Sequence, residues 1–350
     1  MSLFRRSGRD RPDPRPAVER FWQWWAENRS QVLGAAARGE DGEVRRMLGP
    51  AVEALDPGLR YAIEPGTDAF HRLVVTAAGR TDLLALAERW RVGAPPADDE
   101  VEYVSRRVPD PRVMQYTREI DDFDIAYSEL TAVVRVDRDR AKVDVVVHHP
   151  LFPLLSRDHR LEVATEAVHG VLGEDDVERW LGELDVSGEV ALDPIDLSTL
   201  PMVIGQLSPG RTGTPTGGWV TLTGRAGKSE IRATVRRPFG PADAPLCDTH
   251  VAIVLPYPAG ADGLPEHQGV DDQVDRLIEQ VVEALGGAGP HVVLVGKQFG
   301  ARRAIAHLYV DSLEVEPDQA RDVVSSWPHG GAVLRAKFDP AYRGVGHLLS

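Results

Sequence analysis

The stretch that decides the fold is residues 249–285, "THVAIVLPYPAGADGLPEHQGVDDQVDRLIEQVVEAL". Its first nine residues are mostly apolar and β-branched, a composition typical of a buried strand. After a loop rich in Gly and Pro, apolar residues recur at the 3.6-residue spacing of an amphipathic helix, at positions 274, 277, 278, 281, 282 and 285. Asp271 or Asp272 is suited to cap the start of this helix. The stretch therefore predicts a strand followed by a helix that packs on it.

Further elements follow in a recognisable order. We expect strands at "HVVLVGKQF" (291–299) and "RRAIAHLYV" (302–310), a helix at "PDQARDVVSSW" (317–327) and a strand at "GAVLRAKFD" (331–339). The order β-α-β-β-α-β is that of the ferredoxin-like arrangement, here preceded by a β-hairpin over 218–238. The strands carry apolar residues on both faces, so we expect the N-terminal domain or a partner chain to cover the second face.

The hairpin contains Gly227, Lys228 and Ser229, three letters that also close a phosphate-binding loop. That loop needs a Gly five positions before Gly227, where this chain has Leu222, and it needs a helix afterwards. Instead, apolar and polar residues alternate from Ile231 onward, which is the period of a strand. The segment therefore predicts a hairpin turn and no nucleotide site.

The remaining sequence indicates a second α+β domain. Helical spacing covers 18–32 and 44–55, and a further helix is expected over 158–184, with a kink or break at Gly173. Strand patterns are present at 59–65, 70–77, 100–105, 122–130, 131–137 and 142–150, and the turn "DRDR" between the last two predicts a hairpin. We expect a flexible basic tail at 1–17, an N-terminal α+β domain at 18–189, a linker at 190–216 and the C-terminal ferredoxin-like domain at 217–350.

Composition narrows the function. The chain of 350 residues has a formal net charge of −14, which opposes binding to nucleic acid. One cysteine, Cys247, excludes an internal disulfide and a cysteine-based zinc site. The N-terminus lacks the apolar segment of a secretory signal, and no apolar run is long enough to span a membrane. We therefore expect a soluble cytoplasmic protein with no nucleic acid or membrane partner, no metal and no cofactor.

The candidate site residues are few. His148 and His149 end a predicted strand, and Glu174 and Asp175 lie on the helix that follows, so a His/carboxylate site is one reading of this region. The other reading is a polar strand end and a helix cap. In the aromatic run "FWQWW", Phe21, Trp22 and Trp25 share one helical face, whereas Trp24 is expected to be exposed as a contact residue.

Several of these segments resemble an uncharacterised bacterial family, described as a domain of unknown function. The resemblance is carried by "FWQWW", "LRYAIEPG", "HRLVVTAAG", "ERWRVGAP" and "VLGEDDVERWLGELD", and by residues 218–312. The segment from residue 313, ending in "RAKFDPAYRGV", is similar to the end of ferredoxin-like regulators that inhibit ribonuclease E by binding it. The resemblance implies an acidic regulator that binds another protein.

The sequence contains no recognisable catalytic motif, such as the G-x-S-x-G elbow of serine hydrolases. It therefore favours a non-catalytic protein-interaction or regulatory protein with a protein partner, in which the basic tail is a further possible contact. A hydrolase that uses His148 or His149 with Glu174 is the alternative. A purely structural or immunity-type partner would give the same sequence pattern as the first hypothesis.

Overall fold

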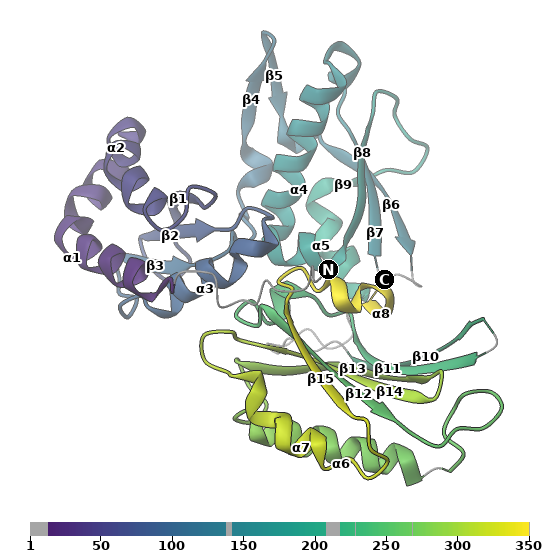
Figure 1. Cartoon of the computed structure of the whole chain (residues 1–350). Helices are drawn as coiled ribbons and strands as arrows, with labels where there is room; N and C mark the ends of the chain where they lie inside the picture. Colours follow the sequence, from purple (N-terminus) through teal and green to yellow (C-terminus); the bar gives the residue numbers. More distant parts are fainter. Residues whose placement is uncertain (1–12, 138–141, 208–217, 228, 268, 350) are drawn as a thin grey trace, which may run out of the picture. The chain divides into compact units, whose positions relative to one another are not determined.

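The computed structural model describes residues 13–137, 142–207, 218–227, 229–267 and 269–349 (Figure 1). The chain forms a mixed α+β structure and divides into two compact units. The larger unit joins residues 1–105 to residues 216–350, and the smaller unit is residues 106–215. In this division the first 105 residues group with the C-terminal sheet, whereas the sequence placed them with residues 106–189.

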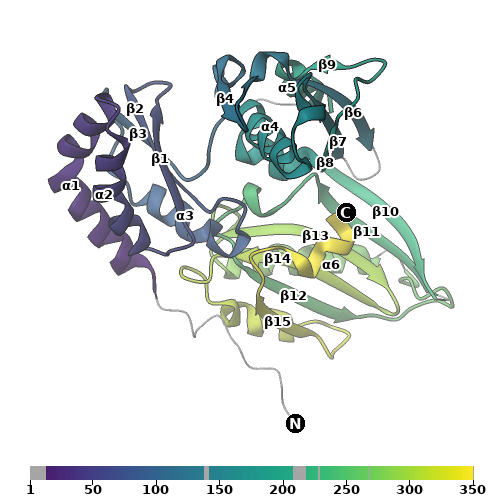
Figure 2. The ribbon, with the colours of Figure 1, turned by 90° about the horizontal axis from the view of Figure 1, so that it is seen from above.

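The N-terminal part of the larger unit packs two helices on a three-stranded sheet. Its elements are α1 (Arg15–Ala37), α2 (Asp41–Glu53), β1 (Arg60–Pro65), β2 (His71–Thr76), α3 (Leu84–Val92) and β3 (Val101–Val104). β1 and β2 are antiparallel, and β2 pairs with β3 in parallel because α3 makes the crossover between them. Figure 2 shows α1 and α2 side by side against this sheet.

Tryptophans fill the core of this part. Trp25 is buried, and its indole nitrogen donates to the Tyr103 hydroxyl at 3.0 Å. Trp22 stacks on Trp90 at 4.9 Å and donates to the Trp90 carbonyl oxygen at 2.9 Å. The aromatic stripe predicted on α1 is therefore the inward face of that helix.

The C-terminal part of the larger unit is one six-stranded sheet in the order β10-β11-β13-β14-β12-β15. The elements are β10 (Gly218–Ala226), β11 (Ser229–Arg237), β12 (Thr249–Pro256), α6 (Gly269–Ala284), β13 (Val292–Gly300), β14 (Arg303–Val310), α7 (Arg321–Ser325), β15 (Val333–Phe338) and α8 (Gly346–Leu349). All neighbouring strands are antiparallel. The hairpin over 218–238 and the helix over 271–285 are confirmed, and the Gly227 turn leads into a strand. Lys228 lies outside the described residues.

Each face of this sheet has its own core. α6 and α7 cover one face, where Val251, Ile253 and Leu255 of β12 pack with Val274 and Ile278 of α6 (Figure 1). The end of the same chain covers part of the other face through Tyr342, Val345 and Leu348, which pack on Val235 and Tyr309. The sequence predicts that the N-terminal domain or a partner chain covers this face. For the part of the face near Val235 and Tyr309 that prediction is wrong, because residues 339–349 of the same chain fold back onto it.

The smaller unit is built around a long helix. Its elements are β4 (Thr117–Ile120), β5 (Phe123–Ala126), β6 (Thr131–Asp137), β7 (Lys142–His148), α4 (Arg157–Trp180), β8 (Leu181–Ser187), β9 (Ile195–Asp196) and α5 (Leu200–Leu207). β4 pairs with β5, and a second sheet has the order β8-β7-β6-β9. α4 contains non-helical backbone at Gly173, with φ 71°, so the predicted interruption is confirmed.

Two predicted boundaries differ from the structure. Residues 15–17 of the expected tail belong to α1, while residues 1–12 lie outside the described part of the chain. The segment expected as a linker, 190–216, contains β9 and α5, whose Leu200 and Ile204 are buried in the core of the smaller unit. β6 and β7 pair as predicted, and the turn residues 138–141 between them lie outside the described residues.

Candidate binding pocket

A candidate site in the larger unit is a pocket of about 820 Å³. The start of α1, the segment after α2 and the first turns of α3 form one side, and the start of β12, the segment after β14 and the end of β15 form the other. Residues that line it include Asp13, Arg20, Leu55, Asp82, Leu86, Arg89, Asp248, Thr249, Ser312, Leu313, Val315, Asp318, Ala336, Lys337 and Phe338. The pocket thus combines apolar walls with polar groups from distant parts of the chain.

Carboxylates outnumber basic groups around this pocket. The lining includes the acids Asp13, Asp56, Asp82, Asp248, Glu316 and Asp318 but only the bases Arg20, Arg89 and Lys337. Arg20 and Lys337 are exposed, whereas Arg89 is held inside by ion pairs. The field inside the pocket therefore favours a positively charged group.

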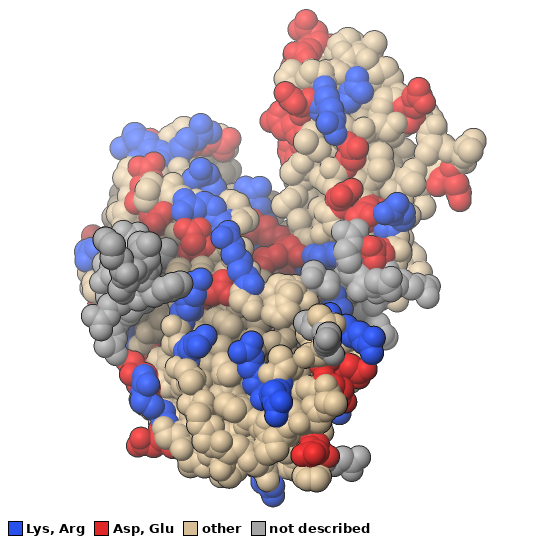
Figure 3. Space-filling view, turned by 45° about the vertical axis from the view of Figure 1, so that its right-hand side comes forward, with Lys and Arg blue, Asp and Glu red and all other residues tan. Residues whose placement is uncertain are grey.

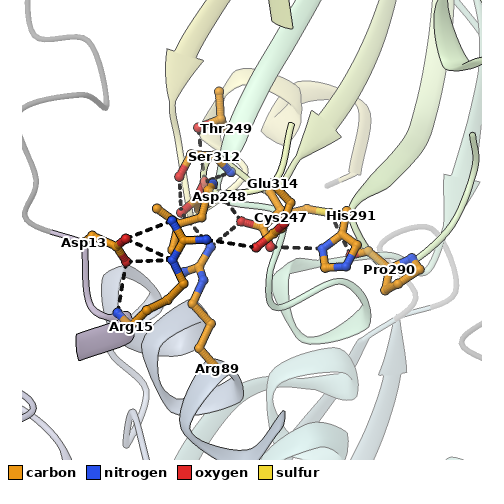
Figure 4. Close-up of polar contacts among 12 residues, drawn as sticks. Asp13, Arg15, Arg89, Cys247, Asp248, Thr249, Pro290, His291, Ser312 and Glu314 are labelled. Carbon is orange, nitrogen blue, oxygen red and sulfur yellow. Dashed lines mark hydrogen bonds and ion pairs between the residues drawn. The ribbon is translucent and has the colours of Figure 1, made fainter. Parts of the chain in front are cut away.

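A buried polar network lies beside the pocket (Figure 4). The Arg89 guanidinium of α3 is hydrogen-bonded to the Asp311 carboxylate, and its Nη2 lies 3.7 Å from Oδ2 of Asp248. The two carboxylate side chains are only 2% and 7% exposed. Two buried carboxylates therefore share the guanidinium of Arg89.

Asp248 is fixed by three further donors. Its Oδ1 accepts from the Ser312 backbone N–H at 3.2 Å and from the Thr249 hydroxyl at 3.1 Å, and its Oδ2 accepts from the Ser312 hydroxyl at 2.9 Å. Burial nevertheless raises the pKa of this carboxyl above its ordinary value. A second cation close to Asp248 would favour its ionised form.

The neighbours of the network are not arranged as a nucleophile and base. His291 Nδ1 lies 3.0 Å from Oδ2 of Asp311, whereas the Cys247 thiol donates to the Pro290 carbonyl oxygen at 3.4 Å. Burial raises the pKa of the Cys247 thiol to about 12, which keeps it protonated at neutral pH. Cys247 is buried in the core on the second face of the sheet.

The predicted histidines are buried strand-end residues. His148 is 7% exposed, and its Nδ1 lies 3.1 Å from the Ser187 carbonyl oxygen at the end of β8. His149 is 1% exposed; its Nε2 lies 3.2 Å from the Ala126 carbonyl oxygen, and its Nδ1 accepts from the Leu151 N–H. Burial lowers the pKa of His149, and the carboxylate that acts on it is Glu129.

The predicted carboxylates belong to a different group of contacts. Asp175 forms an ion pair with Arg106, and the Glu174 backbone N–H donates to the Arg107 carbonyl oxygen at 2.9 Å. The charge of Glu174 acts on His169, whose pKa is lowered mainly by burial. These contacts do not join the carboxylates to His148 or His149.

Trp24 is not the exposed contact that the sequence predicts. Its side chain is half-buried, packs against the N-terminal core and lies 5.8 Å from the Phe21 ring and 6.3 Å from the Trp25 ring. Trp24 is partly covered because the neighbouring aromatic rings are large enough to shield a side chain that lies beside the buried stripe.

Charge is unevenly distributed between the units. The smaller unit contains 21 Asp and Glu against 12 Lys and Arg, so it supplies most of the negative charge. Figure 3 shows acidic and basic side chains interspersed over the face in view. One exposed ion pair of the chain joins Arg118 to Glu162 at 2.5 Å. Such exposed pairs contribute little to stability and keep the surface hydrated.

Among the described residues, no group of three or more His, Cys, Asp and Glu side chains is arranged to hold a metal ion. No helix in the described part of the chain has the length and apolar character needed to cross a membrane. Compared with protein-family models, curated proteins and solved structures, the chain has no match in any of the three.

The sequence did carry one signal for this pocket. Asp248 directly precedes one apolar strand and Asp311 directly follows another, and the pairing of Thr249 with Val310 places the two acids next to each other. Their shared partner Arg89 lies 222 residues before Asp311. No local pattern connects positions so far apart, so the pocket emerges only from the folded chain.

Proposed function

We propose that this protein is a non-catalytic protein-interaction protein that binds an extended segment of another protein along β15. The observation that carries the proposal is that the last residues of this edge strand, Ala336, Lys337 and Phe338, also line the 820 Å³ pocket. A free strand edge offers main-chain hydrogen bonds, and an adjacent pocket selects one side chain of the added strand.

The backbone groups of β15 are oriented for such pairing. The Asp339 N–H donates to the Asp248 carbonyl oxygen at 2.8 Å, so the N–H of residue 339 points toward β12. Backbone groups alternate in direction along a strand, so those of Leu334, Ala336 and Phe338 point away from β12. Leu334 and Ala336 therefore present outward-pointing hydrogen-bonding groups at this edge.

The chemistry of the pocket favours a lysine or arginine of the partner. Its walls include Leu55, Leu86 and Val315, which suit the aliphatic stem of a long basic side chain. The charged end would meet Asp248, which shares Arg89 with a second carboxylate. The partner segment is therefore an extended one with a basic residue opposite the end of β15.

The element order supports the proposed fold class. β13-β14-β12-β15 with α6 and α7 on one face is the strand order expected of a ferredoxin-like domain, and the hairpin β10-β11 extends it. The likeness of the C-terminal segment to regulators of ribonuclease E is compatible with protein binding and remains a prediction. So does the cytoplasmic location. The contacts of His149 and Asp175 form separate groups, which disfavours the hydrolase alternative.

The test uses a library of extended peptides in which the central residue is Lys, Arg, Ala or Glu. Binding to the full chain is measured by fluorescence polarisation, and we expect Lys and Arg peptides to bind best. Asp248→Asn and Ala336→Pro should each weaken binding by about tenfold or more, because they remove the charge partner and an outward N–H. The matched controls are Glu279→Gln, at an exposed position of α6 outside the pocket, and Ala336→Ser, which keeps the outward N–H.

Two results would contradict the proposal. One is equal binding of Lys and Glu peptides; the other is full binding by Ala336→Pro with an unchanged melting temperature. Repeating the measurement after deletion of residues 1–12 shows whether the Arg-rich N-terminus competes with the peptide, since Asp13 and Pro14 line the pocket.

A further inference from the structure

The opposite edge of the six-stranded sheet has a different character. β10 is a nine-residue strand, and within the part of the chain that the structure describes it pairs only with β11. It is exposed along most of its length; Trp219 is 54% and Val220 39% exposed. Natural edge strands are usually protected by Pro, by bulges or by several charges. β10 has no Pro, pairs with β11 without a register shift, and carries only one charged residue, Arg225.

The hairpin geometry shows which backbone groups of β10 are free. Ala226 pairs with Ser229, only three positions further along the chain, so this closing pair is hydrogen-bonded within the hairpin. Alternation along the strand then directs the backbone groups of Trp219, Thr221, Thr223 and Arg225 away from β11. The free edge therefore presents four consecutive sets of donor and acceptor groups.

The side chains of these residues are complementary to themselves. We propose that β10 pairs with β10 of a second copy, antiparallel about a two-fold axis at Leu222. In this register Leu222 faces its own symmetry mate, Thr221 faces Thr223 of the partner subunit, and Trp219 faces Arg225 of the partner subunit. Each pair occurs twice or lies on the axis, as a two-fold interface requires.

Each of these pairs is favourable. Trp219 opposite a guanidinium gives a cation–π contact, and opposed threonines are good cross-strand neighbours. Arg225 is already held on this face, since its guanidinium lies 3.2 Å from Oε1 of Glu230 on β11. The four outward-facing residues of each copy would together form about eight backbone hydrogen bonds. Two six-stranded sheets would thereby become one continuous sheet.

The complementarity of β10 to its own sequence favours a second copy of this chain as the partner at this edge. A strand of unrelated sequence could use the same backbone groups, but it would have to supply a basic residue, two small polar residues and an aromatic residue in this spacing. β10 supplies that pattern itself, read in reverse. The inference is independent of the proposed peptide site, which lies at the other edge of the sheet on β15.

The oligomeric state of the full chain tests the proposal. Sedimentation equilibrium over a range of concentrations should show a reversible dimer. Thr223→Pro removes one outward N–H and leaves the bonds to β11, so it should yield a monomer, whereas Thr223→Val should remain a dimer. A monomer at every concentration, or a dimer that persists in Thr223→Pro, would overturn the proposal.

A cysteine scan tests the register. Leu222→Cys places two thiols opposite each other at a non-hydrogen-bonded pair, where Cα atoms about 4.5 Å apart permit a disulfide. It should cross-link under mild oxidation. Thr221→Cys, whose symmetry mate is offset along the strand, should cross-link far less. Equal cross-linking of both variants would reject this register. The native chain, whose one cysteine, Cys247, is buried, gives the background level of cross-linking.

The two proposals fail separately. Thr223→Pro should abolish the dimer and leave peptide binding intact, while Ala336→Pro should do the reverse. If Thr223→Pro abolishes both, the peptide would depend on the dimer, and the assignment of separate roles to the two edges would be wrong.

Discussion

Acid should destabilise the C-terminal sheet through His307. This side chain is 4% exposed on the face covered by the chain's end, and its Nδ1 lies 3.0 Å from Nε2 of His250. Its Nε2 has no hydrogen-bond partner among the described residues, and the ring of His347 lies 6.2 Å away. Burial, and then the two neighbouring histidines, lower the pKa of His307 to about 3.

The sign and size of the effect follow from this pKa. In the unfolded chain the pKa of histidine is about 6.5, so above that value neither state binds a proton and the stability is fully present. As the pH falls from 6.5 toward 3, the unfolded state gains a proton that the native state refuses. At pH 4.5 the difference amounts to two pH units, or about 3 kcal/mol of lost stability. His250, whose pKa is also lowered by burial, acts in the same direction.

The variant His307→Leu replaces the titrating imidazole with an apolar side chain of similar size. At pH 7 it should cost about 1 kcal/mol, because His250 loses its hydrogen-bond partner. Between pH 7 and 4.5 it should lose about 3 kcal/mol less than the native chain. Other nearby charges, Asp339 and Lys337, are unchanged in both proteins and cancel in this comparison.

The free energy of unfolding is measured by urea unfolding at several pH values. Hydrogen exchange of the β12 and β14 segments then reports the stability of this sheet separately from that of the smaller unit. His329→Leu, at an exposed position, is the matched control and should follow the native pH dependence. The reasoning would be refuted by equal losses of stability in the native chain and in His307→Leu between pH 7 and 4.5.

Three further changes have defined outcomes. Arg89→Met should destabilise the larger unit by about 3–5 kcal/mol in thermal or urea unfolding, because Asp311 and its neighbour lose their cation; an unchanged melting temperature would contradict the network. Native Cys247 should resist thiol reagents at pH 8 and react only after unfolding, since its pKa is about 12; rapid labelling of the folded chain would exclude this. Gly296→Ala should cost about 1–3 kcal/mol, because its Cβ would lie 2.8 Å from the Thr234 carbonyl oxygen; calorimetry of the variant measures it.

The sequence by itself determined the local elements of this protein. The order of strands and helices from Thr249 to Asp339, the hairpin at Gly227 and the interruption at Gly173 all follow from side-chain periodicity and backbone preference. These properties depend on residues close together in the chain. For the same reason, the rejection of a phosphate-binding loop needed only the strand pattern that follows Gly227.

Only the tertiary structure decided which segments meet. It paired Arg89 with two acids more than 150 residues away, folded residues 339–349 onto the second face of the sheet and covered part of Trp24 with neighbouring rings. It also grouped the contacts of His149 and of Asp175 separately. Contacts of this kind depend on the packing of whole surfaces, and packing is specified by shape and buried charge summed over many residues rather than by any local pattern.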